Sequence, residues 1–343
     1  MNEQKILLSS RKLPDQTRIE LTREIGSSYE IRTMQDLDDS EIGRIEILLL
    51  DTAVDNDRKI ISGGELGKFS GLKLIQSTRA GVDVLDFRKI PPNVLVCGNI
   101  GAYGEQMAEH VFGMVLYFAR NIGKSDLELK QGDWEIPTDS IFLKGKTMVL
   151  IGAGGIGKAV ASIASCFGMK TIGVNSTGKS LPNFDEVVSI EKLDEVLVKA
   201  DVTVVSLPLT VKTFHLIDKQ KLRAMKRNSI LVNVARGFII DELALFQHLK
   251  ENPSFKCALD VWWWYPKQGE KFSQKFPFFD LPNFLGTPHD SGVVPETEEL
   301  ALLGAIENIG RFVRNDELKG VMDRQDYIGL SSLIAKEKEK KTT

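Results

Sequence analysis

The stretch TMVLIGAGGIGKAVA, residues 147–161, decides the fold class because it joins an apolar run to a glycine-rich turn and a helical pattern. Gly152, Gly154 and Gly157 have the spacing GxGxxG, which is weak evidence alone in a chain with 29 glycines. Between a strand and a helix, these glycines allow a tight turn, close approach to a pyrophosphate and close helix packing. The stretch therefore predicts a dinucleotide site at the helix N-terminus. The alternative is a glycine-rich turn without a ligand.

The end of the next predicted strand bears on the choice between the two nicotinamide cofactors. Where NAD binds, a carboxylate about 20 positions on commonly holds the ribose hydroxyls, and it would repel a 2′-phosphate. Here the run TIGV ends at Asn175, and Ser176, Thr177 and Lys179 add two hydroxyls and a cation. This pattern predicts NADP as the preferred cofactor and NAD as an accepted one. Alternatively, Asn175 binds a plain ribose and Lys179 is a solvated surface charge.

Short apolar runs alternate with helical patterns along most of the 343 residues, which predicts an α/β fold of parallel βαβ units. The length fits two domains, and a second series of units begins at Lys146. Strands are expected at residues 5–8, 45–50, 73–76, 94–97, 147–151, 171–174, 202–206, 230–234, 257–261 and 284–286. Helices are expected at 14–25, 105–122 and 296–313, an irregular segment at 124–140, and disorder in the terminal KEKEKKTT.

The composition argues against several functional classes. The net charge of −3 and the pI near 6.0 give no basic excess for binding nucleic acid. No apolar run is long enough to cross a bilayer. The start, MNEQKILLSS, lacks the features of a signal peptide, and Cys97, Cys166 and Cys257 form no C-x-x-C pair. We therefore expect a cytoplasmic protein with reduced, mostly buried thiols, and no metal site, because no metal-binding motif occurs.

Further sequence blocks occur in a specific order: STRAGVD (77–83), GEQMAEHVFGMVL (104–116), LKGKTMVLIGAGGIGKAVA (143–161), SLPLTVKTFHLI (206–217), MKRNSILVNVARGFIIDELAL (225–245), ALDVWWWYP (258–266) and TPHDSG (287–292). Through these blocks nearly the whole chain resembles the D-isomer-specific 2-hydroxyacid dehydrogenases. That family includes reductases of glyoxylate and hydroxypyruvate and dehydrogenases of lactate, phosphoglycerate and formate. The resemblance implies two Rossmann-like doubly wound domains. The cofactor domain, 99–289, would be inserted into a discontinuous substrate domain, 1–98 and 290–343.

Hydride addition to a 2-oxo acid needs an anchored carboxylate, a polarised carbonyl and a proton for the developing alkoxide. Arg236, in NVARG just after a predicted strand, can hold a carboxylate with its guanidinium fork. The resemblance gives Arg236 that role and makes His289, in TPHDSG, the proton donor. The alternatives are a surface arginine and a structural histidine. We interpret His110, His215 and His248 as structural.

The family's third catalytic residue is a glutamate five positions after the aspartate of the LDV block, where it hydrogen-bonds the histidine and raises its pKa. In this chain Tyr265 occupies that position after Asp260, so the relay glutamate is absent. A phenol is neutral at pH 7, so proton donation by His289 should weaken as pH rises through a pKa near the unperturbed ~6.5. In a competing interpretation, Asp290 or Glu296 folds back onto His289 and replaces the glutamate.

The resemblance also implies binding contacts. The backbone amides of Ala80, Gly81 and Val82 would cradle the substrate carboxylate, beside Arg79, which either adds positive charge or is a solvated side chain. The implied cofactor-binding residues are Gly152, Gly154, Gly155, Ile156, Gly157, Asn175, Ser176, Thr177, Lys179, Leu207, Pro208, Thr213, Val234, Ala235, Arg236, Asp260 and His289. The aromatic run 262–265 either walls the substrate pocket or packs in the core or a dimer contact.

Together these patterns predict an oxidoreductase that transfers hydride between NAD(P)(H) and a small 2-oxo or 2-hydroxy acid, such as glyoxylate or hydroxypyruvate. The alternative is a cofactor-binding sensor or corepressor with little turnover. The missing glutamate favours the sensor, whereas retention of Arg236 and His289 favours the enzyme. Oxidation of formate or phosphite is a third candidate without a positive sign in the sequence. The family pattern, the apolar helix at 105–122 and the arm around Trp134 predict a homodimer through the cofactor domain.

Overall fold

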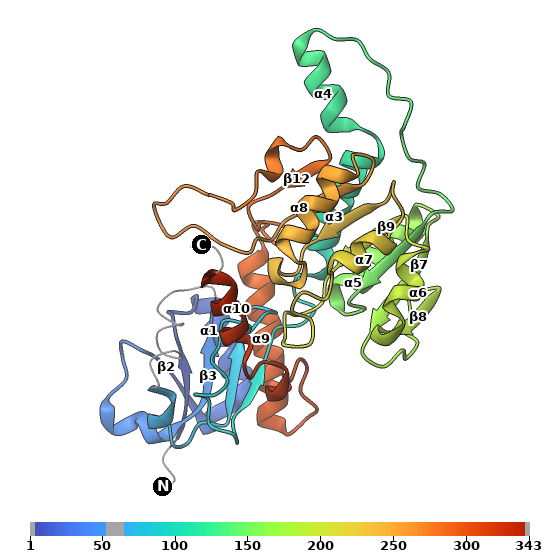
Figure 1. Cartoon of the computed structure of the whole chain (residues 1–343). Coiled ribbons are helices and arrows are strands. Elements are labelled where there is room, and N and C mark those ends of the chain that lie inside the picture. The colour runs from blue at the N-terminus through green and yellow to red at the C-terminus, as the bar shows by residue number, and fades with distance from the viewer. Residues whose placement is uncertain (1–3, 53–64, 340–343) are drawn as a thin grey trace. The chain divides into compact units, whose positions relative to one another are not determined.

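The computed structural model describes residues 4–52 and 65–339 (Figure 1). The chain divides into two compact units: unit 1 comprises residues 1–103 and 294–343, and unit 2 comprises residues 104–293. Each unit contains its own parallel sheet. The predicted α/β class is confirmed, with one doubly wound domain inserted into another. No helix of the described residues is long and apolar enough to span a membrane.

Unit 1 is built on a five-stranded parallel sheet in the order β2-β1-β3-β4-β5. Its strands are β1 (Lys5–Ser9), β2 (Tyr29–Thr33), β3 (Ile45–Leu50), β4 (Leu74–Ser77) and β5 (Leu95–Cys97). The helices α1 (Asp15–Ile25) and α9 (Thr297–Arg314) share an apolar cluster with these strands, in which Leu21 and Ile25 meet Ile306 and Ile309. Sequence analysis missed β2, an edge strand in which charged residues interrupt a short apolar pattern.

Unit 2 contains a seven-stranded parallel sheet in the order β12-β11-β10-β9-β6-β7-β8. Its strands are β6 (Thr147–Ile151), β7 (Lys170–Asn175), β8 (Glu186–Ser189), β9 (Val202–Val205), β10 (Ile230–Asn233), β11 (Lys256–Leu259) and β12 (Phe284–Gly286). Its helices are α3 (Gly104–Ala119), α4 (Ile122–Gln131), α5 (Gly155–Cys166), α6 (Leu193–Leu197), α7 (Lys219–Ala224) and α8 (Glu242–Glu251). The strand order reverses between β6 and β9, and ligands of such sheets bind at the carboxyl ends of the strands at that point.

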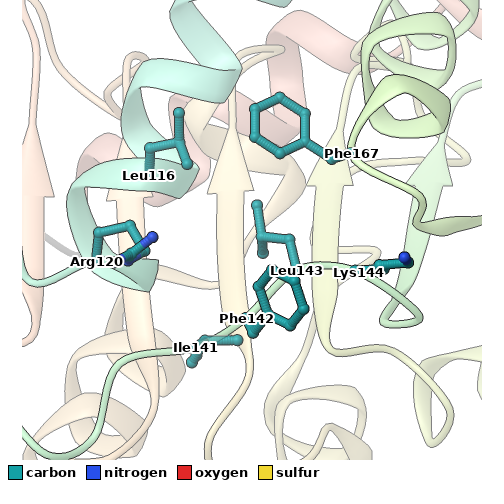
Figure 2. A pocket seen from close by; sticks show the side chains of 7 residues that line it. All are labelled: Leu116, Arg120, Ile141, Phe142, Leu143, Lys144 and Phe167. Atoms are coloured by element: carbon teal, nitrogen blue, oxygen red, sulfur yellow. The ribbon is translucent and has the colours of Figure 1, made fainter.

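The segment after α3 departs from the sequence-based prediction. Asn121 adopts a left-handed conformation with φ of 54° and ends one helix, and α4 begins at the next residue. The predicted irregular segment 124–140 is therefore wrong in its first half. The chain then returns to the body of unit 2 (Figure 1). There, Ile141 and Phe142 line a pocket with Leu116 of α3 and Phe167 at the end of α5 (Figure 2).

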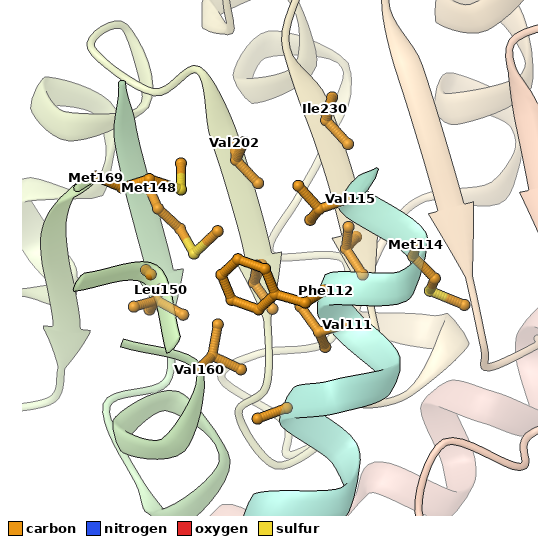
Figure 3. Close-up of a cluster of buried hydrophobic side chains, with 14 of the residues drawn as sticks. Val111, Phe112, Met114, Val115, Met148, Leu150, Val160, Met169, Val202 and Ile230 are labelled. Atoms are coloured by element: carbon orange, nitrogen blue, oxygen red, sulfur yellow. The ribbon is translucent and has the colours of Figure 1, made fainter. Parts of the chain in front are cut away.

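The core of unit 2 fixes the position of its glycine-rich turn. Val111, Phe112 and Val115 of α3 pack in one buried cluster with Leu150 of β6 and Val160 of α5 (Figure 3). Because β6 and α5 flank the turn, this cluster holds both of its ends. Burying an apolar side chain of this size stabilises a fold by roughly 1.5–3 kcal/mol, so the cluster makes the turn rigid.

The C-terminal helix is longer than the sequence suggests. The helix α10 spans Leu330–Glu339, and Leu330 is buried at its start. Lysine and glutamate are good helix formers, so the charged residues extend a helix that Leu330 anchors. The disorder predicted for KEKEKKTT is therefore wrong for residues 336–339, and residues 340–343 lie outside the described residues.

The three cysteines form no disulfide. Cys97 and Cys257 are buried, whereas Cys166 at the end of α5 is exposed. Burial raises the pKa of the Cys97 thiol to about 11, so this thiol stays protonated at neutral pH.

Candidate functional site

The turn between β6 and α5 has the geometry of an anion cradle. Gly152 has a φ of 111°, and a Cβ there would lie 2.7 Å from the backbone nitrogen of Leu207. A Cβ on Gly157 would clash with the carbonyl oxygen of Gly152. Above Gly154, in contrast, no atom lies within 4 Å of where a Cβ would stand, and no side chain caps α5. The space and the exposed helix N-terminus, which includes Gly155 and Ile156, fit a pyrophosphate.

The loop after β7 is shaped by the side chain of Asn175. Its Oδ1 accepts hydrogen bonds from the backbone amides of Thr177 (3.0 Å) and Gly178 (2.6 Å), and its Nδ2 donates to the Lys179 carbonyl oxygen (3.1 Å). Asn175 therefore folds its own loop, a role that the sequence did not suggest. The side chains of Ser176, Thr177 and Lys179 are left exposed on this loop.

The loop after β9 carries three more of the predicted cofactor contacts. The Thr213 hydroxyl donates to the carbonyl oxygen of Pro208 (2.7 Å) and accepts from the Thr210 amide (2.8 Å), so the loop is closed on itself. Leu207 lies against Gly152, and the Ser206 hydroxyl donates to the Gly152 carbonyl oxygen (3.0 Å). The structure thus brings this loop and the glycine-rich turn together.

Arg236 lies three positions after the end of β10 and is half-buried. Its Nη1 donates to the carbonyl oxygen of Ala235 (2.7 Å), and its own carbonyl oxygen accepts from Asn233 Nδ2 (2.9 Å). The next residue, Gly237, has no room for a Cβ because the backbone of Trp262 lies against it. The Arg236 backbone is therefore fixed, while its guanidinium contacts a neutral acceptor. Val234 and Ala235, also predicted to bind cofactor, are buried beside it.

Asp260 follows β11 and is 0 % exposed. Its carboxylate accepts hydrogen bonds from the Thr287 hydroxyl (2.6 Å) and from the backbone amides of Asp290 (3.0 Å) and Ser291 (3.1 Å). A buried carboxylate needs such donors to offset its lost hydration. The three bonds hold the loop 287–291, which carries His289 in a left-handed conformation with φ of 63°. Asp260 thus determines where the predicted proton donor stands.

Tyr265 contacts His289 through its ring. The two ring centroids are 5.4 Å apart with an interplanar angle of 35°, and the phenol oxygen accepts from the Trp262 backbone amide (3.2 Å). Trp262 and Trp263 are both buried, and Trp262 Nε1 donates to the Thr287 carbonyl oxygen (2.9 Å). The aromatic run therefore divides: the two tryptophans pack in the core, and Tyr265 packs beside the histidine.

Unit 1 contains the loop predicted to cradle a carboxylate, directly after β4. Arg79 forms a bidentate ion pair with buried Asp51 (Nε–Oδ1 3.0 Å, Nη2–Oδ2 3.3 Å). Burial acts to lower the pKa of Arg79, but the bonds to Asp51 and the proximity of Tyr103 raise it above its usual value. Arg79 is thus held in place rather than freely solvated. Among the described residues, no acceptor is found for the backbone amides of residues 80–82.

Two neighbours of Asp260, His110 and Thr287, were not predicted as site residues. His110 Nε2 on α3 lies 3.3 Å from the Thr287 hydroxyl, which itself bonds to Asp260. Asp290, considered as a replacement for the relay glutamate, has its carboxylate within 4.8 Å of ligand atoms of His110 and Asp260. Glu296, the other carboxylate considered, belongs to unit 1. The polar His110 on the mainly apolar helix α3 was the only signal in the sequence.

Comparison with known proteins places these features in a family. Residues 112–291 match the family described as D-isomer specific 2-hydroxyacid dehydrogenase, NAD binding domain. D-3-phosphoglycerate dehydrogenase of Methanocaldococcus jannaschii is 31% identical over 82% of this chain, which spans 56% of that longer relative. Hydroxypyruvate reductase of Thermotoga maritima is 31% identical, and the match covers 78% of this chain and 85% of the reductase.

A solved structure agrees with these sequence matches. A D-isomer specific 2-hydroxyacid dehydrogenase family protein from Aeromonas salmonicida subsp. salmonicida superposes with a TM-score of 0.74 at 30% identity, covering 94% of this chain and 100% of that one. The family match covers more than half of the chain, and it falls on the unit that carries the glycine-rich turn. The chain therefore belongs to the NAD(P)-dependent D-isomer-specific 2-hydroxyacid dehydrogenase family.

Proposed function

We propose that this protein reduces a small 2-oxo acid, such as glyoxylate or hydroxypyruvate, and oxidises the corresponding 2-hydroxy acid. One observation carries the proposal: the buried Asp260 carboxylate fixes the loop of His289 at the same sheet edge as Arg236 and the glycine-rich turn. A histidine anchored at that edge can serve as the proton donor that reduction of a carbonyl requires. Bound NAD(P)H supplies the hydride.

The side chains of the protein then supply binding and the proton. The guanidinium of Arg236 exchanges the neutral Ala235 carbonyl oxygen for the substrate carboxylate, which gains a charge-assisted bidentate interaction. Its remaining N–H groups polarise the carbonyl. The ring of His289 donates a proton to the developing alkoxide oxygen.

A substrate screen tests the proposal. Purified protein should oxidise NADPH in the presence of glyoxylate, hydroxypyruvate, pyruvate or a bulkier 2-oxo acid, measured by loss of absorbance of the reduced nicotinamide. Tight cofactor binding without turnover on the whole panel would instead support the sensor or corepressor. Tyr265 is the observation that favours this second candidate, because it supplies no charge to His289.

The cofactor preference is predicted to be NADPH over NADH. The exposed hydroxyls of Ser176 and Thr177 and the cation of Lys179 surround the end of β7, where a 2′-phosphate would lie. Replacing Lys179 with alanine should weaken NADPH binding about tenfold and leave NADH binding unchanged, because only NADPH carries the phosphate. Fluorescence titration with each cofactor measures both constants.

The Asn175→Asp variant is the converse change. A carboxylate keeps the acceptor bonds to Thr177 and Gly178, loses the donor bond to Lys179, and repels a phosphate. It should therefore bind NADH more tightly than NADPH. Wild-type protein that binds NADH at least as tightly as NADPH would contradict the predicted preference.

We also propose that two copies associate through unit 2. Trp134, Ile136 and Phe142 expose 82, 78 and 74 % of their surface on the segment after α4. Of these three, Phe142 also lines the pocket in Figure 2, together with Leu116, Arg120, Ile141, Leu143, Lys144 and Phe167. Large exposed apolar side chains such as these are typical of an interface between subunits.

Sedimentation of the purified protein should therefore give the mass of a dimer at micromolar concentration. The double variant Trp134→Asp, Phe142→Asp should shift the protein toward a monomer, because burying two unpaired carboxylates opposes association. Exposed Val198 on the same unit supplies the control, and Val198→Asp should leave the dimer intact. A wild-type monomer at that concentration would refute the proposal.

A further inference from the structure

A chain of hydrogen bonds connects α3 to the loop that carries His289. His110 Nε2 lies 3.3 Å from the Thr287 hydroxyl oxygen, and that hydroxyl lies 2.6 Å from Asp260 Oδ1. His110 and Thr287 are 177 positions apart in the sequence, so the contact exists only in the folded unit. The Asp260 carboxylate then bonds the amides of Asp290 and Ser291, on the far side of His289.

Counting the available protons shows which group donates in each of these hydrogen bonds. The two oxygens of Asp260 accept three hydrogen bonds in all, from the Thr287 hydroxyl and from the backbone amides of Asp290 and Ser291. In the bond to Asp260 the Thr287 hydroxyl is the donor, so its single proton points to the carboxylate. Since that proton is used, the hydroxyl can only accept from His110. His110 must carry its proton on Nε2 and donate it to Thr287.

The alternative is a metal ion held by His110, Asp260 and Asp290, whose ligand atoms all lie within 4.8 Å of one another. The oxygens of Asp260 already accept three hydrogen bonds, which leaves them poorly placed to bind a cation. The hydrogen-bond chain accounts for the closeness of the three residues without an ion.

We infer that His110 is a positioning residue: through Thr287 and Asp260 it holds the loop 287–291 in the one conformation that presents His289 to substrate. The left-handed backbone of His289 makes such support necessary, because a residue with a side chain adopts this conformation only at an energetic cost. This inference rests on the proposed role of His289 as proton donor. The donation of a hydrogen bond from His110 to Thr287, however, can be measured without any turnover.

Nuclear magnetic resonance tests the direction. The chain has four histidines, so ¹⁵N-labelled imidazoles give four sets of signals that single substitutions can assign. We expect His110 to be protonated on Nε2, and Thr287→Val to change the signals of both His110 and His289. Neutral His110 with its proton only on Nδ1, or His289 signals that ignore Thr287→Val, would overturn the inference. The NMR experiment decides the inference even if the protein turns over no 2-oxo acid. An absence of turnover would refute only the proposed function.

Kinetics test the positioning. His110→Leu removes the donor and should lower kcat about tenfold while the KM and dissociation constant of the cofactor stay unchanged. His110→Gln keeps an N–H donor and should restore most of kcat. Thr287→Val should lower kcat as much as His110→Leu does. The double variant should lower kcat no further than either single change, because both changes break the same series of hydrogen bonds. An unchanged kcat in soluble His110→Leu, or additive losses in the double variant, would contradict the positioning role.

Two controls separate the alternatives. His248 is a partly buried histidine on α8 of the same unit, and His248→Leu should leave kcat unchanged. A similar loss in this variant would attribute the effect to general destabilisation and overturn the inference. Treatment of the wild type with a chelator should leave kcat unchanged. A chelator-dependent loss that added divalent metal restores would replace the hydrogen-bond chain with a metal site.

Discussion

Replacing Arg236 with alanine lowers kcat for 2-oxo acid reduction by about a hundred- to a thousandfold, the range expected when one stabiliser of developing oxyanion charge is removed. Binding of NADPH stays close to wild type, because the glycine-rich turn and the loop after β7 do not depend on the guanidinium. The backbone of residue 236 is held by Asn233 and by the close packing of Gly237, so truncation of the side chain leaves the local fold in place. Steady-state kinetics and fluorescence titration measure the two effects.

Arg236→Lys distinguishes recognition from charge. An ammonium keeps the positive charge but cannot form two parallel bonds to a carboxylate, so most of the activity should still be lost. The matched control is Arg227→Ala, an exposed arginine of the same unit, which should keep full activity. Turnover near wild type in Arg236→Ala would remove Arg236 from the mechanism.

Replacing His289 with glutamine lowers kcat by about a hundred- to ten-thousandfold, the usual contribution of a general acid. It also removes the pH dependence of the remaining rate between pH 5 and 8. Reduction requires protonated His289, so the wild-type rate falls as pH rises through the pKa of this histidine. Tyr265 contacts the ring without a negative charge, so nothing in that contact holds the proton to higher pH. Profiles of kcat against pH for both proteins measure this.

Tyr265→Glu should move the alkaline limb of the wild-type profile to higher pH, because a carboxylate beside the imidazole favours its charged form. Asp290→Asn separates the competing interpretation, in which Asp290 already supplies that charge. Its carboxylate lies near His110 and Asp260, so we expect Asp290→Asn to leave the limb where it is. If the rates of both the wild type and Asp290→Asn stay level well above neutrality, the missing glutamate does not limit proton donation by His289.

Features encoded by neighbouring residues could be predicted from the sequence. The glycine spacing of the turn, the strand before it and the helix after it are all local, and the structure contains each of them. The mostly apolar runs of buried parallel strands, such as Ile45–Leu50, are equally local. The edge strand Glu186–Ser189 was missed because it is half-exposed and carries no such run.

Features that depend on distant residues or on side-chain hydrogen bonds could not be predicted. Asn175 looked like a ribose contact, but the structure has its amide bonded within the loop that it begins. His110 looked structural, because its partner Thr287 lies 177 positions away and only the parallel sheet brings the two together. The pairing of Arg79 with Asp51 likewise joins the ends of two neighbouring strands, β4 and β3.

The insertion of unit 2 also sets the order in which the two units are completed on the ribosome. Leu21 and Ile25 of α1 are covered by α9, which is translated only after all of residues 104–293. At 5–20 residues per second, translating an insertion of this length takes roughly ten to forty seconds. Unit 2 can finish folding in that interval, whereas the first half of unit 1 waits with the apolar face of α1 uncovered. Nascent chains stalled before α9 should therefore be the ones that chaperones hold.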